Sequence, residues 1–131
     1  MKKNVVLDTN ILVSAAISPN GNPAKSIEFL RNNEDIQVYY SREILAEYEE
    51  VLSRPQLNIS AGTKTRIISS VISDATLIAP AASTIKLPDE SDRIFYDAAK
   101  KSSAILVTGN GKHYPAEKFI MTPAQFVALF N

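Results

Sequence analysis

Short apolar runs alternate with longer segments of helical spacing along this chain, and this alternation restricts the possible folds more than any other feature. The runs that we expect to be strands cover residues 3–8, 36–40, 76–78, 104–107 and 119–121. Strands separated by helices are typical of parallel sheets, because each helix returns the chain to the edge where the next strand starts. The sequence therefore predicts an α/β fold with three layers, α/β/α, around a central parallel sheet of about five strands.

The segments between these runs carry helix start and stop signals. Serine and threonine accept a backbone hydrogen bond at a helix N-cap, and proline suits the first helical turn. The helices that we expect cover residues 10–17, 42–53 and 89–102, with further helices starting near Pro23, Ser60 and Pro123. No repeat, linker or low-complexity tract divides the 131 residues, so we expect one domain over residues 1–131.

Composition narrows the class of protein. Lys plus Arg and Asp plus Glu both number 14, so a global positive field cannot attract nucleic acid, and binding would need a local patch or a metal ion. The chain has no cysteine, which removes disulfides, thiolate zinc sites and a cysteine nucleophile. The first apolar run is interrupted by Asp8, too early for a signal peptide, and no run can span a membrane. We expect a cytoplasmic protein without a membrane partner.

The run Val5-Val6-Leu7-Asp8-Thr9-Asn10 presents one carboxylate at the end of an expected strand. A buried strand that ends in Asp is a common way to build a metal or phosphate site at the carboxyl edge of a parallel sheet. Asp, Thr and Asn are also good N-caps, so the same residues can simply begin a helix. These residues alone leave both interpretations open.

Other acids lie where they can approach that edge. Glu47 and Glu49 flank the apolar stripe of the helix over 42–53 on opposite sides, and helix geometry alone does not choose between them. Acids at the start of the helix over 89–102 are expected for the helix dipole, and Asp92 is the best placed of them to face the sheet edge. For any one of these acids, a solvated helix face is the simpler interpretation.

Converging carboxylates need neutralisation. Two unit charges 4 Å apart repel by about 4 kcal/mol at an effective dielectric constant near 20, so such a cluster persists with protons or cations. Mg²⁺ and Mn²⁺ prefer oxygen ligands, and a metal held by acids can activate water and stabilise the charge that builds on a phosphodiester. That chemistry requires no covalent protein nucleophile.

Three segments, in this order, resemble the PIN-domain nucleases, and in particular the VapC-like toxins of toxin–antitoxin pairs. Residues 5–14, with the sequence Val-Val-Leu-Asp-Thr-Asn-Ile-Leu-Val-Ser, resemble the opening strand of that family with its first metal-binding Asp. Residues 44–52 resemble its second acidic segment, and residues 92–99 followed by 105–110 resemble its third acidic helix and closing strand. The resemblance covers nearly the whole chain.

The resemblance implies a ribonuclease that depends on Mg²⁺ or Mn²⁺, usually forms a homodimer and is often inhibited by an antitoxin protein. It implies catalytic, metal-binding roles for three carboxylates and selects Glu47 over Glu49. The metal ligands that it implies are Asp8, Glu47, Asp92 and Asn110. Residues expected to orient the site or line its rim are Thr9, Asn10, Thr108 and Asp97. Many members of the family have Asp where this chain has Asn110, so three strong carboxylates remain and a second metal is held more weakly.

The loop after Asn110 contains Lys112 and His113, the only histidine of the chain. A surface-loop histidine without a special role is the simpler interpretation, and contact of both residues with a substrate phosphate is the functional one. Two other functions stay open. A PIN fold can bind RNA or a protein without catalysis, which Asn110 motivates. A phosphatase usually needs a second Asp two residues after the first, and here that residue is Asn10.

Overall fold

The structure is a computed structural model that describes residues 2–130. Its strands form one parallel sheet in the order β3-β2-β1-β4-β5. The strands are β1 (Lys3–Leu7), β2 (Ile36–Tyr40), β3 (Thr76–Leu77), β4 (Ile105–Val107) and β5 (Ile120–Met121). The sheet confirms the predicted fold class, and the strands lie where the apolar runs placed them.

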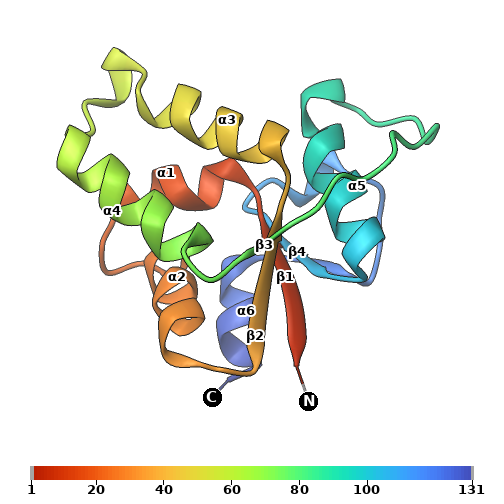
Figure 1. The fold of residues 1–131 in the computed structure, drawn as a ribbon, viewed down its shortest axis with the longest axis horizontal. Coiled ribbons are helices and arrows are strands. Elements are labelled where there is room, and N and C mark those ends of the chain that lie inside the picture. Colours follow the sequence, from red (N-terminus) through yellow and green to blue (C-terminus); the bar gives the residue numbers. More distant parts are fainter. Residues whose placement is uncertain (1, 131) are drawn as a thin grey trace.

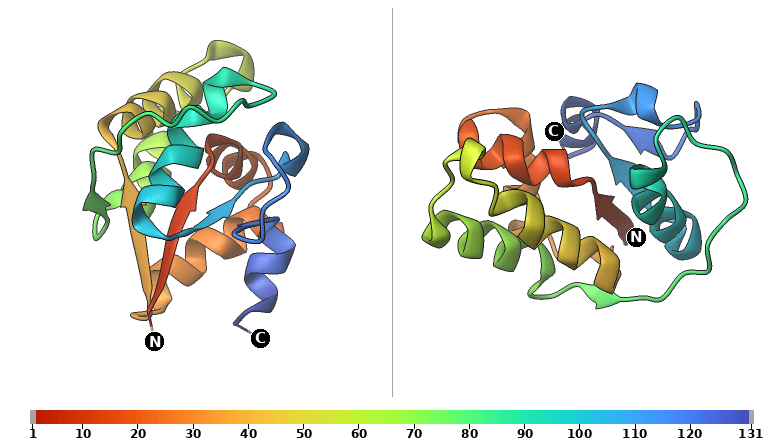
Figure 2. Two further views of the ribbon diagram at one scale, coloured as in Figure 1. Left: turned by 90° about the vertical axis from the view of Figure 1, so that its right-hand side faces the viewer. Right: turned by 90° about the horizontal axis from the view of Figure 1, so that it is seen from above.

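Helices cover both faces of this sheet. The α-helices are α1 (Thr9–Ile17), α2 (Asn22–Asn32), α3 (Arg42–Leu52), α4 (Ala61–Ile72), α5 (Arg93–Ser102) and α6 (Pro123–Ala128). Helix α5 packs against the central strands on one face, while α1, α2, α4 and α6 pack together on the other (Figures 1 and 2). Helix α3 follows β2 directly and lies at the carboxyl end of the sheet (Figure 1). Within residues 2–130, no helix combines the length and the apolar character that crossing a membrane requires.

The expected helix over 89–102 begins differently from its prediction. Residues Glu90–Asp92 form a short 3₁₀ turn, η2, and α5 itself starts at Arg93. The Asp89 carboxylate accepts hydrogen bonds from the amide and hydroxyl of Ser91, at 2.9 and 2.7 Å. Local bonding of an Asp side chain to the backbone two residues on favours a tight turn over an α-helical start. Two further 3₁₀ turns are η1 (Pro55–Leu57) and η3 (Gly111–His113).

The central strands are apolar on both faces because helices bury both. Val5, Val6 and Leu7 of β1 and Leu106 and Val107 of β4 have no exposed surface. A parallel sheet covered on both sides has strands that are almost continuously hydrophobic, whereas a half-exposed strand alternates. This burial explains why the run before Asp8 is so apolar and why Asp8 is the first polar side chain after it.

The chain changes direction across the sheet between β1 and β4. From β1 it proceeds to β2 and β3 on one side, and then crosses to β4 and β5 on the other. The register pairs Leu7 with Val107, and the Asp8 amide donates to the Val107 carbonyl at 3.0 Å. The residues after both strands therefore lie side by side at the carboxyl edge. Open α/β sheets bind their ligands in the crevice at such a reversal of strand order.

Candidate active site at the carboxyl ends of β1 and β4

Asp8 lies at this reversal and is almost fully buried, with 5% of its surface exposed. Its Oδ2 accepts hydrogen bonds from the Thr108 hydroxyl at 2.9 Å and the Tyr114 hydroxyl at 2.8 Å. Its Oδ1 has only a long contact of 3.4 Å with the Asn10 amide, which makes Asp8 the N-cap of α1. The N-cap interpretation is therefore confirmed. It leaves lone pairs on Oδ1 free, so it does not exclude a ligand role.

Thr108 connects the two strand ends. Its buried hydroxyl donates to Asp8 and accepts from the Asn10 side-chain amide at 3.3 Å and from the Asn110 backbone amide at 3.0 Å. The side-chain carbonyl of Asn10 accepts in turn from the Gly109 amide at 3.1 Å. The structure thus places Asn10 and Thr108 in one network around Asp8, and this network ties the loop after β4 to the start of α1.

Glu47 reaches the same edge from α3. The Thr9 hydroxyl donates to its Oε2 at 2.9 Å, so the residue next to Asp8 holds the Glu47 carboxylate. Partial burial raises the pKa of Glu47, against the lowering effect of the Thr9 hydrogen bond, and the nearby negative charge of Asp8 raises it further. Glu49 is exposed on another side of the helix. The structure therefore brings Glu47, and not Glu49, toward Asp8.

Two buried tyrosines support the site. The Tyr48 hydroxyl of α3 donates to the Leu7 carbonyl at 2.6 Å, which joins α3 to the end of β1. Tyr114 donates to Asp8, and burial together with the negative charge of Asp8 raises its pKa far above the ordinary value, so it stays protonated. Sequence analysis placed Tyr48 in no site role and missed Tyr114. An aromatic residue with a hydroxyl in the loop that follows β4 was the available signal.

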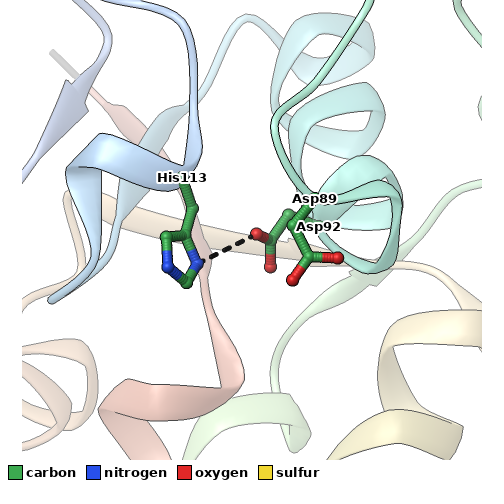
Figure 3. A group of neighbouring side chains, drawn as sticks. All are labelled: Asp89, Asp92 and His113. Atoms are coloured by element: carbon green, nitrogen blue, oxygen red, sulfur yellow. Dashed lines mark ion pairs between the residues drawn. The ribbon is translucent and has the colours of Figure 1, made fainter.

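Asp92 occupies the third side of the site, at the junction of η2 and α5. Its side chain is 13% exposed, and its Oδ2 is buried without a hydrogen-bond partner. The Nδ1 of His113 lies 3.4 Å from Oδ2 (Figure 3), a contact that is an ion pair only when the imidazole is protonated. Burial raises the pKa of Asp92 to about 6, and the charges of Asp8 and Asp89 add to this effect. The protein therefore leaves the negative charge of the Asp92 carboxylate poorly compensated.

The three acids affect one another electrostatically, but they do not form the tightest cluster. Among residues 2–130, the acids and histidines whose ligand atoms all lie within 4.8 Å of one another are Asp89, Asp92 and His113. The charges of Asp8 and Glu47 also raise the pKa of Asp92. The structure thus groups Asp92 most closely with two residues that the resemblance did not assign as ligands.

The remaining predicted residues divide into two groups. Asn110 and Lys112 are exposed on the rim beside His113. Asp97 lies elsewhere: it is buried, and its Oδ2 accepts from the Ser83 amide at 3.1 Å. Five helical positions separate it from Asp92 and rotate it by about 140° around the axis. Asp97 therefore points to the segment over 78–89, which loops around the outer side of α5 (Figure 2), and is not brought to the rim.

The donor set at this edge fits a hard divalent cation. Carboxylate oxygens are the preferred ligands of Mg²⁺ and Mn²⁺, and three partly buried carboxylates repel one another without neutralisation. The buried, unpartnered Oδ2 of Asp92 is the atom whose bonding a cation would complete. A divalent cation held by these residues would supply the charge that neutralises a phosphate and would activate water.

Comparison with known proteins finds a relative in sequence and two in fold. The chain is 34% identical over 113 residues to the uncharacterized protein MJ1680 of Methanocaldococcus jannaschii, an alignment that covers 84% of this chain and 72% of that protein. PAE2754 of Pyrobaculum aerophilum has a similar fold, with a TM-score of 0.62, 14% identity and coverage of 98% and 97% of the two chains. VapBC2 of Rickettsia felis, solved bound to a DNA fragment from its promoter, matches with a TM-score of 0.56, 20% identity and coverage of 91% and 96%.

The family model that describes the PIN domain matches residues 4–112. The match contains Asp8, Glu47, Asp92 and Asn110 and stops one residue before His113. It covers most of the chain, and the parallel sheet agrees with it. The chain therefore belongs to the PIN domain family.

Proposed function

We propose that this protein is a metal-dependent endoribonuclease, which hydrolyses RNA phosphodiesters with Mg²⁺ or Mn²⁺ as cofactor. The observation that supports it best is the buried, unpartnered Oδ2 of Asp92, in a site whose other walls carry Asp8 and Glu47. A carboxylate left in this state weakens a fold unless a ligand completes its bonding. Membership of a nuclease family agrees with a cation as that ligand.

The residues that would hold the cation are Asp8, Glu47 and Asp92, with the side-chain carbonyl of Asn110 as a neutral fourth donor. When bound, a divalent cation lowers the pKa of water and stabilises negative charge on the phosphodiester. The chain itself contributes orientation. Because two hydroxyls occupy Oδ2 of Asp8, its Oδ1 is the oxygen that stays available. Thr9 holds Glu47 in the same way.

Substrate binding falls to the rim. The chain has no net charge, so attraction of RNA depends on the cation and on local positive groups. Lys112 is exposed beside Asn110 and is placed to contact a phosphate of the strand that enters the site. RNA as the substrate class remains part of this proposal.

The test is cleavage of a panel of RNAs with Mn²⁺ or Mg²⁺ by the parent protein and by Asp8→Asn. Asparagine preserves the shape of Asp8 but removes its charge, so we expect cleavage to fall by at least a hundredfold, about 2.7 kcal/mol of transition-state stabilisation. The exposed Glu43 of α3 provides a matched control as Glu43→Gln, which should cleave like the parent. Absence of cleavage across the panel, or equal cleavage by Asp8→Asn, contradicts the proposal.

We further propose that the nuclease is the toxin of a toxin–antitoxin pair, acts in the cytoplasm and forms a homodimer. The support is the shared fold with VapBC2 of Rickettsia felis. Induced expression should then slow growth of a host cell, and Asp8→Asn should relieve the effect. Light scattering of the purified protein decides between a monomer and a homodimer.

One observation favours a second function, a PIN fold that binds RNA or a protein without catalysis. Asn110 is exposed and offers no charge at the position after β4. Calorimetric titration with Mn²⁺ separates the two. Binding that disappears in Asp8→Asn favours the nuclease, whereas RNA binding without any cation requirement favours the binding module.

A further inference from the structure

The loop after β4 contributes no carboxylate to the site. By the register of β1 and β4, Thr108 is the counterpart of Asp8, and Asn110 follows two residues later in the loop, where its side chain is neutral and exposed. Its backbone is committed to the local turn, since its amide donates to Thr108 and its carbonyl accepts from the His113 amide at 2.9 Å. If a cation binds near Asp92, Asn110 can offer only a neutral oxygen, so a stronger donor has to come from another group.

The loop geometry places His113 next to that gap. Residues Gly111–His113 form η3, a tight turn whose backbone bonds are Asn110 carbonyl to His113 amide and Gly111 carbonyl to Tyr114 amide, at 2.9 and 3.1 Å. The next residue, Tyr114, is buried and anchored to Asp8 by its hydroxyl. The backbone of His113 therefore lies between a hydrogen-bonded turn and a residue bonded to the site, and its partly exposed ring points toward Asp92 (Figure 3).

The contact between His113 and Asp92 has the spacing of two ligands of one ion. Nδ1 lies 3.4 Å from Oδ2, and Oδ2 makes no hydrogen bond, so the pair does not satisfy itself. Ligands about 2.1 Å from an octahedral ion lie about 3 Å apart when they are adjacent. Asp89 extends the group, since its ligand atom lies within 4.8 Å of both others. Its bonds to Ser91 use one oxygen, Oδ1.

We propose that His113 is a ligand of the divalent cation that Asp92 binds, with Asp89 as the neighbouring acid, so that an imidazole nitrogen takes the place of the carboxylate missing at Asn110. The inference rests on the proposed function and specifies its cofactor. Imidazole suits Zn²⁺ and Ni²⁺ best, and among the cations that prefer oxygen ligands the transition metal Mn²⁺ accepts it more readily than Mg²⁺ does. The site should therefore discriminate against Mg²⁺ more strongly than a site built from carboxylates alone.

The experiment depends on the single histidine of the chain. His113 is the only histidine, so in the full chain without a polyhistidine tag any imidazole coordination must come from it. Pulsed electron paramagnetic resonance of the Mn²⁺-loaded protein, prepared with ¹⁴N- and then ¹⁵N-histidine, should show a nitrogen coupling that changes with the isotope. The coupling should be lost in His113→Gln. The matched control is Lys112→Gln, an exposed neighbour in the same turn, which should retain it.

The affinity for Mn²⁺ is a second measurement, because the direction of its change in His113→Gln separates a ligand from a cationic partner. If His113 is a ligand, the parent protein should bind Mn²⁺ more than about tenfold more tightly than the His113→Gln variant, with a smaller loss for Mg²⁺. If His113 is instead only a positively charged partner of Asp92, its removal should leave the affinity for Mn²⁺ unchanged or raise it, because a competing positive charge is gone. The double variant Asn110→Asp with His113→Gln should regain most of the lost affinity, since it restores a carboxylate beside the gap.

The outcomes separate this inference from the proposed function. Mn²⁺ binding with RNA cleavage but no histidine coupling, or an affinity unchanged in His113→Gln, overturns the inference and leaves the nuclease proposal intact. No binding of either Mn²⁺ or Mg²⁺ by the parent protein overturns both, whereas binding of Mg²⁺ alone overturns the inference only. Isotope-sensitive coupling that is lost in His113→Gln, together with the weaker affinity, supports the inference whether or not a suitable RNA is at hand.

Discussion

The two sides of the site differ in how completely the protein satisfies its own carboxylates. Asp8 is buried, and two hydroxyls bond one of its oxygens, while its backbone joins β1 to β4. Asp92 lies on a short turn, with a buried oxygen that has no hydrogen-bond partner and a histidine at 3.4 Å. Hydrogen bonds within the fold stabilise the carboxylate of Asp8, whereas the charge of Asp92 is left poorly compensated.

This difference suggests a division of labour. Hydrogen bonds around Asp8 set its orientation before any ligand arrives, which lowers the cost of binding. Asp92 supplies the driving force instead, because its negative charge is poorly compensated until a cation is present. Substitutions on the two sides should therefore change stability in opposite directions, although both should impair the function that we propose.

The largest effect on stability should come from Asp8→Ala. The substitution leaves the hydroxyls of Thr108 and Tyr114 without their acceptor, and both residues are buried. We expect the free energy of unfolding to fall by about 3 kcal/mol, since each unsatisfied buried donor costs about 1–3 kcal/mol and relief of repulsion with Glu47 and Asp92 offsets part of the loss. Urea denaturation in a chelating buffer measures it. A loss below about 1 kcal/mol would show that Asp8 is not the structural centre of the site.

A smaller loss should follow Tyr114→Phe. The variant keeps the ring in the core and removes only the hydrogen bond to Asp8, a buried bond to a charged acceptor, so we expect a loss of about 1.5 kcal/mol. Tyr96→Phe is a suitable comparison. Its hydroxyl donates to the half-exposed Glu117 at 2.6 Å, outside the site, and its removal should cost less. Equal losses in the two variants would contradict a special role for the bond to Asp8.

The contrast between the two sides also explains what sequence reasoning could reach. The position of Asp8 could be predicted from the sequence because both faces of β1 are buried, so the strand is continuously apolar and the carboxylate after it is conspicuous. Helix geometry alone left Glu47 and Glu49 equivalent. The family resemblance selected Glu47. In the structure its partial burial and the hydrogen bond from Thr9, a contact between segments far apart in the chain, distinguish it from the exposed Glu49.

The loop after β4 was the least predictable part. Residues 108–118 have no periodic pattern, so nothing in their order showed that Tyr114 turns inward to Asp8 or that His113 turns toward Asp92. The prediction for the start of α5 was wrong for a related reason, because local hydrogen bonding by Asp89 converts the expected first helical turn into η2. In both places short-range polar bonds, rather than hydrophobic spacing, determine the backbone.

On the Asp92 side, substitution should stabilise the protein when no metal is present. The folded-state pKa of Asp92 is about 6, against an ordinary value of 3.8, so the unfolded chain releases this proton first. The resulting penalty on the folded state is absent below pH 4, grows as the pH rises through 6 and is complete above it. At pH 8 in a chelator, Asp92→Asn should raise the free energy of unfolding by about 1 kcal/mol, less than the full shift implies because water at the rim screens the charge.

The same substitution gives two internal checks. Its gain in stability should vanish at pH 4, where Asp92 is protonated in the folded parent protein, and should reverse when Mn²⁺ is added, because only the parent protein gains from the cation. Thermal denaturation at both pH values, with and without Mn²⁺, measures this. The exposed Glu49→Gln serves as control and should show neither dependence. Destabilisation by Asp92→Asn at pH 8 in a chelator would mean that the Asp92 charge is already compensated within the protein.

The smallest effect on metal binding should come from Asp97→Asn, which tests whether an unsatisfied acid is sufficient or has to face the site. Asp97 resembles Asp92 in one respect, since its Oδ1 is also buried without a partner. It differs in direction, because its other oxygen accepts from Ser83 of the segment that loops around α5. Asparagine keeps an oxygen acceptor for that amide, so we expect Mn²⁺ affinity to change less than about twofold, whereas loss of a direct ligand should exceed the tenfold typical of indirect supports. Calorimetric titration of Asp97→Asn beside Asp92→Asn measures both. If the two variants lost Mn²⁺ affinity equally, the cation would respond to the total charge of this end of the molecule, and the arrangement of Asp8, Glu47 and Asp92 at the edge of the sheet would not define its site.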